Sequence, residues 1–479
     1  TVFLINGLSG SIVINVVTAG DILWQELPAE VDPASLDNDV LVIGAGSGGS
    51  HAAAALACAG LQVLLVEAGP RLPHNFRRDV WESRKLGIRN SHFWWHWRTA
   101  PTPIFIYAGR GQGGTSAVNG MVYTRGHQAD FPVNWTDIES ARFEIGPPVL
   151  ELEEFELESA SPVVRALVSA FENIGVPWIG QHGTEQTKQG LGFLAQWRFR
   201  RSSFQEAFDV RCKVPCPMLQ KNGQLKERCG KVRILSNAKA QRLVWSTNSS
   251  VPRVEEVILL YRKNLTITAP AKHVLLTAGA IGTPSLLLAS GAASLCNKGI
   301  GGGLREHFGF DVVIALRASC LDVLSGEAKS RLAKPLVVFL GTDRPYVEIS
   351  MRPVCCVNDA REERVCLQTS MILLRGVSGG RIELDADAAD GSSNVRFWLH
   401  SADLMALGVA LNFVREYVLT SPLLAQYDPQ VLPIGRFPKV EDGNGLLEHI
   451  RSKFRNYNHL ASSMIGAVDD RLRLKGCEG

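Results

Sequence analysis

The sequence predicts an α/β protein: a Rossmann-like nucleotide-binding domain with a parallel sheet, into which an α+β domain with an antiparallel sheet is inserted. Residues 39–67 read as a strand, a tight turn, a helix and a second strand. The two apolar runs are short and rich in valine, leucine and isoleucine, as in strands buried on both faces of a parallel sheet. Residues 232–275 alternate as antiparallel strands do, and 272–291 read as a buried strand that runs into a helix and returns the chain to the first domain.

Two helices are expected in the inserted domain. The stretch "SPVVRALVSAFENIGV" begins with Ser161, a suitable N-cap because Pro162 comes directly after it. A second helix is expected from Ser401 to Leu424. We therefore divide the chain into an unassigned leader (1–36), three segments of the nucleotide-binding domain (37–135, 225–311 and 446–479) and two segments of the inserted substrate domain (136–224 and 312–445).

Composition narrows the class of protein. The chain has 479 residues, 46% hydrophobic and 20% charged, with a formal net charge of +3. These values are typical of a globular protein and give no indication of a nucleic-acid partner. The uncharged residues 1–20 contain asparagine and glycine, so a buried or disordered leader is favoured over a membrane anchor or targeting remnant. Localisation stays open.

The ten cysteines do not reach the density of a disulfide scaffold. Cys212 and Cys216, followed by Cys229, could form a local clip, but no histidine lies close enough in sequence to favour a metal site. His92 and His96 are four residues apart, which could place a metal pair on a helix. Because "SHFWWHWR" is half aromatic, we expect a packed aromatic cluster instead, and no metal.

The turn after the first strand carries a G-x-G-x-x-G pattern at Gly44, Gly46 and Gly49. These glycines permit a tight turn, close approach of a pyrophosphate and close packing of the helix, whose N-terminal amides then face the phosphates. Glu67 ends the next strand, where a carboxylate can accept hydrogen bonds from ribose hydroxyls. The pattern predicts a bound dinucleotide and does not by itself distinguish NAD from FAD.

A second glycine-rich stretch, "GRGQGGTSAVNGMVY" at 109–123, decides between them. It resembles the G-G-[ST]-S-x-x-N segment that lies against the flavin in glucose-methanol-choline (GMC) oxidoreductases. The resemblance implies FAD, held non-covalently because Val118 stands where some relatives have a linking histidine. The expected cofactor-binding residues of the two stretches are Gly44, Gly46, Ser47, Gly49, Glu67, Ala68, Arg110, Gly113, Gly114, Thr115, Asn119, Gly120 and Met121.

Other segments are similar to the same family. "LSNAKAQRLVW" resembles a strand that brackets the adenine around Ala240, and "HVLLTAGAIGTPSLLLASG" resembles a strand and helix that bring Ala278 and Gly279 near the flavin. "IGGGLREHF" resembles V-G-x-N-L-x-D-H, with Gly303 and Glu306 in place of the asparagine and aspartate.

The end of the chain, "NYNHLASSMIGAVDDRLRLKGCEG", resembles the family segment H-P-V-G-T-C-x-M-G followed by VVD and LRV-x-G. The resemblance places His459 on the catalytic histidine, Gly466 on the closing glycine and Asp469 on the aspartate. Family members usually continue through a strand and helix that carry a second histidine or asparagine. This chain stops at Gly479, so we expect the last segment to be truncated.

The resemblance implies oxidation of a small-molecule alcohol. Hydride would pass to flavin N5 and the hydroxyl proton to His459, with oxygen or another acceptor reoxidising the flavin. Two alternatives stay open: the light-driven fatty-acid decarboxylases of the same fold, against which His459 argues, and a catalytically impaired flavin-binding homologue. The sequence does not identify the alcohol.

Overall fold

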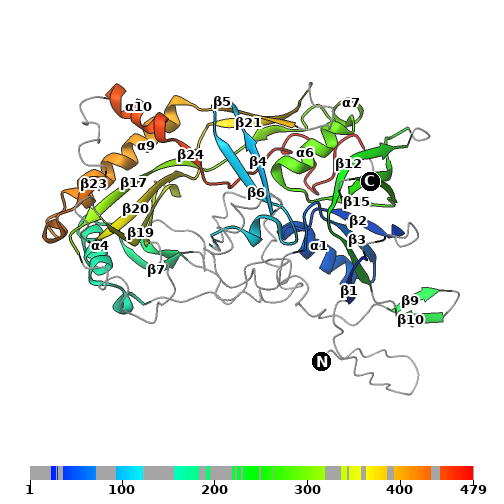
Figure 1. Cartoon of the computed structure of the whole chain (residues 1–479), viewed down its shortest axis with the longest axis horizontal. Coiled ribbons are helices and arrows are strands. Elements are labelled where there is room, and N and C mark those ends of the chain that lie inside the picture. Colours follow the sequence, from blue (N-terminus) through cyan, green and yellow to red (C-terminus); the bar gives the residue numbers. More distant parts are fainter. Residues whose placement is uncertain are drawn as a thin grey trace, which may run out of the picture.

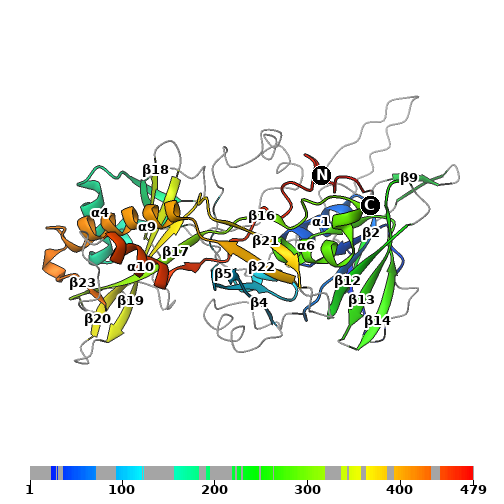
Figure 2. The same ribbon diagram turned by 90° about the horizontal axis from the view of Figure 1, so that it is seen from above.

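The computed structural model of the chain is elongated, with one group of sheets at each end and shorter strands between them (Figures 1 and 2). The structure describes residues 23–28, 30, 36–71, 93–120, 122, 124, 156–182, 190–194, 218–221, 224–227, 230–246, 250–262, 264–318, 336–341, 345–357, 363–385, 393–432 and 443–477.

One end is built on a five-stranded parallel sheet in the order β1-β11-β3-β2-β15. The chain enters through β2, crosses over in helix α1 and returns in β3, which confirms the expected strand, helix and strand. Residues 231–235 were expected among antiparallel strands, and this was wrong: β11 pairs in parallel with β1 and β3. The bounds are β1 Leu23–Glu26, β2 Val40–Ile43, α1 Ser47–Cys58, β3 Gln62–Val66, β11 Lys231–Leu235 and β15 Val274–Leu276.

A three-stranded antiparallel sheet packs against this parallel sheet, as the alternation of residues 238–270 predicts. Alternate side chains such as Val257 and Leu259 join Leu41 and Leu64 of the parallel sheet in one hydrophobic core. Helix α6 begins at Gly279 directly after β15, which confirms the expected strand running into a helix. The bounds are β12 Ala238–Trp245, β13 Val254–Tyr261, β14 Leu265–Pro270, α6 Gly279–Ala289 and α7 Ala292–Leu295.

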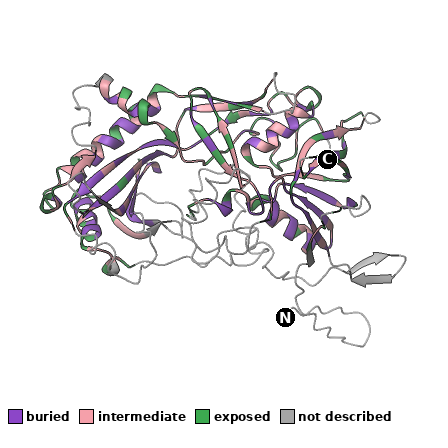
Figure 3. Ribbon diagram, viewed as in Figure 1, coloured by how far each residue is buried: buried purple, intermediate pink, exposed green. Residues whose placement is uncertain are grey.

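The other end is a larger, mostly antiparallel sheet in the order β23-β17-β20-β19-β18-β8-β7, with β24 also on β17. Helices α4, α9 and α10 cover one face of it, and the core lies between them (Figures 1 and 3). Its strands are β7 Trp178–His182, β8 Gly190–Leu194, β17 Phe308–Leu316, β18 Leu336–Gly341, β19 Pro345–Val357, β20 Glu363–Leu373, β23 Gln430–Leu432 and β24 Arg455–Asn456.

The helices of this end agree with the sequence except at one terminus. Ser161 caps α4 (Pro162–Glu172) as expected, its Oγ accepting the amide of Val164 at 3.3 Å. Helix α9 covers Ser401–Val414 and continues as one turn of π-helix over Arg415–Leu419, so the expected end at Leu424 was too late. The third helix, α10, covers Gly443–Lys453.

Short strands join the two ends. The antiparallel pair of β4 (Trp94–Arg98) and β6 (Phe105–Gly109) carries His96, so a helical metal pair is excluded at this position; His92 lies outside the described residues. Among the described residues no group of three or more histidine, cysteine or acidic side chains could hold a metal ion. The other elements are β5 Ala100–Pro101, β9 Met218–Lys221, β10 Gln224–Glu227, β16 Gly302–Leu304, β21 Gly379–Leu384, β22 Ser393–Trp398 and the 3-10 turns Gly114–Ala117, Leu157–Ser159 and Ala425–Tyr427.

Within the described ranges, no helix is long and apolar enough to cross a membrane. The exact boundaries of the two domains stay a prediction. The parallel sheet draws β2 and β3 from segment 37–135 and β11 and β15 from segment 225–311, but its strand β1 comes from the expected leader.

Candidate functional site: two glycine loops and a pair of histidines

The first glycine loop leaves no room for side chains. Gly44 has φ +106°, and a Cβ on it would lie 2.6 Å from the carbonyl oxygen of Thr277. A Cβ on Gly49 would lie 1.9 Å from the carbonyl oxygen of Gly44. Helix α1 begins at Ser47 with no side-chain cap and no acidic residue in its first turn. The loop therefore presents bare backbone and helix N-terminal amides, the arrangement that binds phosphate groups.

The second glycine loop packs onto the first one, backbone against backbone. The amide of Gly113 donates to the carbonyl of Ala45 at 2.7 Å, and a Cβ on Gly114 would lie 2.9 Å from Cα of Gly46. The loop holds its own shape because Oγ1 of Thr115 accepts the amide of Gly109 at 3.1 Å. Two segments that are far apart in sequence thus form one continuous surface.

Glu67 ties the two loops together. Its Oε2 accepts the amide of Ala45 at 2.9 Å, and its Oε1 accepts the amides of Gly69 at 2.8 Å and Gly111 at 2.9 Å. Burial raises the pKa of Glu67, and these hydrogen bonds together with the Arg110 guanidinium oppose that shift. Glu67 was expected to meet ribose alone, and this internal role was not expected because nothing in the motif shows which amides the carboxylate meets.

Arg110 lies between Glu67 and the aromatic residues of β4. Its Nη2 donates to the carbonyl of Ala68 at 3.2 Å, and its guanidinium carbon lies 4.6 Å from the centroid of Trp95. Trp95 in turn stacks on Trp97, with 6.3 Å between centroids. The expected aromatic cluster is therefore present beside the glycine loops, on a strand.

The remaining expected cofactor residues gather around the same loops. Ala238, two residues before Ala240, donates its amide to the carbonyl of Glu67 at 2.9 Å. A Cβ on Gly44 would lie 2.9 Å from Cα of Ala278, at the start of α6. Met121 lies outside the described residues. The contacts described above bring together Gly44, Gly46, Gly49, Glu67, Ala68, Arg110, Gly113, Gly114, Thr115 and Ala278.

His459 lies on a segment that runs antiparallel to residues 305–309. Arg305 and Ala461 exchange backbone hydrogen bonds at 2.9 and 3.0 Å, and β24 pairs with the start of β17. The Nδ1 atoms of His459 and His307 are 3.0 Å apart, with the two rings nearly perpendicular at 86°. The structure therefore pairs His459 with a second histidine, which was not among the expected site residues although it lies in the motif "IGGGLREHF".

A buried carboxyl group holds the backbone of both histidines. Oε1 of Glu306 accepts the amide of His307 at 3.0 Å and that of His459 at 2.8 Å. Burial raises the pKa of Glu306 to about 7, although these amides oppose the shift. Its Oε2 is buried and has no hydrogen-bond partner in the described part of the chain. One carboxylate oxygen of Glu306 thus holds the backbone amides of both histidines.

Both imidazoles are neutral near pH 7. Desolvation by the surrounding protein lowers the pKa of His459, although the residue is exposed to solvent. The pKa of His307 is lowered to about 4. Burial is the larger cause, and the neighbouring His459 adds to it. A neutral imidazole has one bare nitrogen and can accept a proton there.

The histidine segment lies between the two elements that flank the glycine loops. Oδ1 of Asn458 accepts the amide of Tyr107 in β6 at 2.8 Å, and β6 leads directly into the second loop. The hydroxyl of Ser463 donates to the carbonyl of Ala280 in α6. Leu460 packs with Ile106 of β6 between these contacts. The structure therefore joins the His459 segment to the elements beside the glycine loops through direct contacts.

Polar residues continue from this segment across the face of the large sheet opposite α4, α9 and α10. The hydroxyl of Tyr457 donates to Oδ1 of Asp311 at 2.6 Å, and Arg455 pairs with the same carboxylate. Glu348 lies on the same face. It is directly opposite Ile372 on the neighbouring strand, and Ile372 is directly opposite Gly309. Gly309 in turn lies against the ring of Tyr457. Burial raises the pKa of Glu348 to about 7, and the described residues offer it neither a hydrogen bond nor an ion pair.

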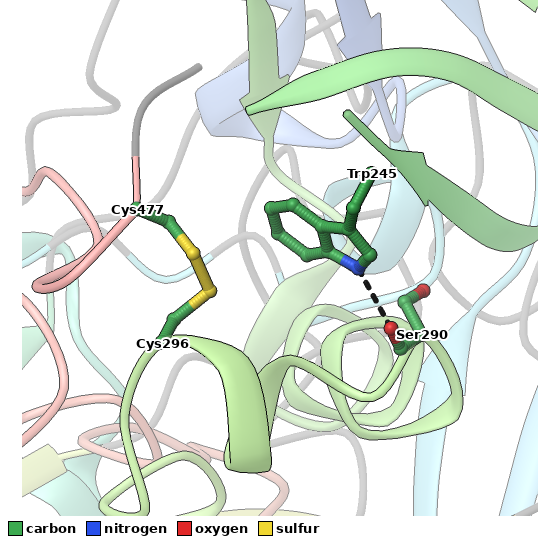
Figure 4. The surroundings of a disulfide bond; sticks show 4 residues. All are labelled: Trp245, Ser290, Cys296 and Cys477. Carbon is green, nitrogen blue, oxygen red and sulfur yellow. Dashed lines mark hydrogen bonds between the residues drawn. A yellow bond between two sulfur atoms is a disulfide. The ribbon is translucent and has the colours of Figure 1, made fainter. Parts of the chain in front are cut away.

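The C-terminal segment is fixed to the nucleotide-binding end. Asp469 accepts the amides of Arg471 and Arg473 at 2.9 Å, which closes the turn at the expected aspartate. Cys477 then forms a disulfide bond with Cys296 after α7, across a sequence separation of 181 residues (Figure 4). This bond was not expected from the sequence, because two cysteines so far apart in the chain leave no local signal. The expected clip of Cys212, Cys216 and Cys229 lies outside the described residues.

Known proteins are similar to this chain in sequence. The family model described as GMC oxidoreductase matches residues 38–309. An oxygen-dependent choline dehydrogenase of Stenotrophomonas maltophilia is 26% identical over 521 residues, which cover 92% of this chain and 89% of that protein.

Solved structures share the fold. Pyridoxine 4-oxidase from Mesorbium loti superposes with a TM-score of 0.72 at 19% identity, covering 92% of each chain. Formate oxidase of Aspergillus oryzae superposes with a TM-score of 0.71 at 16% identity, covering 96% of this chain and 93% of that one. The fold class expected from the sequence, a Rossmann-like domain carrying an inserted domain with an antiparallel sheet, is therefore confirmed.

Proposed function

Because this chain belongs to the GMC oxidoreductase family, we propose that it is an FAD-dependent enzyme that oxidises the CH–OH group of a small-molecule alcohol, with His459 as the base. Bound FAD supplies the acceptor for the hydride that leaves the alcohol carbon. The observation that carries the proposal is the direct linkage of the neutral His459 segment to β6 and α6, the elements that flank both glycine loops.

The residues of the two loops fit FAD. The uncapped N-terminus of α1 suits the pyrophosphate, and the side-chain-free surface of Gly46 and Gly114 suits a flat ring system at close range. Glu67 is in place for a ribose hydroxyl, since its Oε2 accepts a single hydrogen bond within the described structure. Ala240 on β12 is assigned to the adenine side, and Ala278 and Gly279 to the flavin side.

We infer that FAD is held without a covalent bond. Val118, at the position where some relatives carry the linking histidine, is buried against Ala117 and Trp94. An aliphatic side chain offers no nucleophile for such a bond. Acid precipitation of the protein should leave the yellow chromophore in the supernatant, and flavin remaining with the pellet would refute this part of the proposal.

His459 takes the hydroxyl proton while the hydride leaves. Its lowered pKa keeps the imidazole neutral near pH 7, which is the state a general base requires. Oxygen or another electron acceptor then completes the cycle by reoxidising the flavin.

The test is rapid-mixing reduction of the FAD-bound protein by an alcohol in the absence of oxygen. A panel of choline, pyridoxine and benzyl alcohol serves as the probe. His459→Ala should slow bleaching of the flavin by roughly 10²–10⁴, the contribution of a positioned base, with the oxidised spectrum unchanged. The matched control is His273→Ala, at an exposed histidine before β15. Equal rates in the two variants would remove His459 from the chemistry.

A further inference from the structure

The contact between His307 and His459 restricts where their protons lie. Two Nδ1 atoms 3.0 Å apart form a hydrogen bond only if one carries a hydrogen and the other is bare. Because both rings are neutral near pH 7, each has one N–H in total. The ring that donates from Nδ1 must therefore be bare at Nε2, and the ring that accepts at Nδ1 must carry its hydrogen on Nε2.

A second contact decides which ring donates. His307 also makes a hydrogen bond with the backbone of Leu374 that raises its pKa, as a carbonyl acceptor does by favouring a hydrogen on the ring. The amide of Leu374 is already used, donating to the carbonyl of Tyr346 at 2.9 Å. Nδ1 of His307 faces His459, so the nitrogen left for the carbonyl is Nε2. His307 is thus protonated on Nε2 and bare on Nδ1.

We propose that His307 is the positioning residue that fixes the tautomer of His459, with Nδ1–H of His459 donating to Nδ1 of His307 and Nε2 of His459 left bare. This inference rests on the proposed function, because a bare Nε2 is what accepts the hydroxyl proton. It goes beyond it by assigning a role to a residue outside the proposed catalytic and cofactor-binding set. Glu306 supports the arrangement by holding the amides of both histidines on one oxygen.

His307 positions the base and does not take the proton onward. Transfer to His307 would place a cation on a ring whose pKa is about 4, which is unfavourable near neutral pH. The proton accepted by His459 therefore stays on His459, whose Nδ1–H continues to donate to the bare nitrogen of His307.

The direct test reads the tautomer by ¹⁵N NMR of the FAD-bound protein labelled at histidine, at pH 7.5. This spectrum distinguishes an imidazole N–H from a bare nitrogen, and comparison with His459→Ala assigns the signals of His459. We expect Nε2 to be the bare nitrogen of His459 in the wild type. A wild-type His459 with its hydrogen on Nε2 would overturn the proposal.

Variants of His307 complete the test. His307→Phe keeps a ring but removes the acceptor, so His459 should shift towards the Nε2–H tautomer, and flavin reduction should slow about 10- to 100-fold, as for other residues that orient a functional histidine. His307→Asn keeps an acceptor close to the Nδ1 position and should restore both readouts. If His307→Phe does not fold, His307→Leu replaces it in the test. We then expect His307→Asn to keep the wild-type tautomer and rate, and His307→Leu to lose both. An unchanged tautomer in a folded His307→Phe or His307→Leu would refute the inference.

The tautomer separates this inference from the proposed function. If His459→Ala leaves flavin reduction unchanged, the proposed base is wrong, while the NMR result still reports whether His307 fixes the ring.

Discussion

The glycine loops and the histidine pair are built in opposite ways. The loops meet through backbone atoms, and at Gly44, Gly49 and Gly114 a single Cβ would collide with a neighbouring main chain. The histidine pair meets through side chains from segments 152 residues apart in sequence, and its geometry depends on ring nitrogens and one buried carboxyl group.

This difference explains what each region tolerates. A backbone surface has one chemical requirement, the absence of side chains, so most substitutions at its glycines destroy it. A pair of side chains tolerates some substitutions better than others, because a replacement can keep the hydrogen-bond acceptor while it loses the ring. The four changes below test this contrast, from the largest expected effect to the smallest.

Gly49→Ala should have the largest effect. Its Cβ would lie 1.9 Å from the carbonyl oxygen of Gly44, so helix α1 must move away from the sheet. We expect a loss of FAD binding and a fall in the free energy of unfolding of the unliganded protein of at least about 3 kcal/mol. Denaturant unfolding and FAD titration measure the two effects. Gly48→Ala is the matched control: its Cβ meets nothing within 4 Å, so unliganded stability should be kept. Similar losses in both variants would contradict the backbone argument.

Removal of the disulfide bond tests the covalent link between the C-terminal segment and the end of α7. Cys296→Ser, Cys477→Ser and the double variant should each lower the free energy of unfolding by roughly 3–5 kcal/mol, because the bond closes a long loop in the unfolded chain. The three losses should be equal, since either substitution removes the whole bond. Losses that add in the double variant would show that the two cysteines act separately.

Glu348→Gln tests the side-chain region. The pKa of Glu348 is raised from an ordinary value of 4.5 to about 7, so the neutral form is favoured in the folded state. Its contribution to stability is present below pH 4.5 and is lost as the pH rises to 7. Glutamine stays neutral, so the variant should gain up to about 3 kcal/mol relative to the wild type between pH 4 and pH 8. Parallel unfolding curves across this range would show that Glu348 is not desolvated.

Glu67→Gln should have the smallest effect, on the affinity for FAD. Glutamine can still accept hydrogen bonds on one oxygen, but its NH₂ group would face the amide of Ala45. Losing one charged hydrogen bond corresponds to roughly 1.5–3 kcal/mol, or about a 10- to 150-fold weaker affinity measured by flavin titration. Glu26→Gln is the control, since glutamine can still accept the hydrogen bond from Gln112. Equal affinities in both variants would remove Glu67 from the cofactor surface.

Sequence analysis predicts the loop region well because backbone requirements appear as residue types. Only glycine satisfies the positions of Gly44 and Gly114, so the pattern in the sequence reports the geometry. The burial of β2 and β3 on both faces likewise appears as continuous apolar runs. Strand β11 was misjudged because its alternating side chains are also compatible with a parallel position near the edge of the sheet.

The histidine region could be predicted only in part. His459 was found through its motif, but nothing local shows that His307 and Glu306 lie beside it, since the contact depends on strand pairing across the chain. The raised pKa of the Glu348 carboxyl was missed for the same reason: an alternating strand pattern shows which residues share a face but not what that face meets.

The bond between Cys296 and Cys477 also has a consequence for biosynthesis. It encloses residues 297–476, which include His307, His459 and most of the large sheet, whereas α4, β7 and β8 come from the chain before this ring. The ring cannot close until residue 477 has been translated and has left the ribosome. The parallel sheet can collect all its strands from the first 276 residues, so it can assemble while the rest is still being made. The surface of the two glycine loops can therefore form before the disulfide bond that follows the histidine pair.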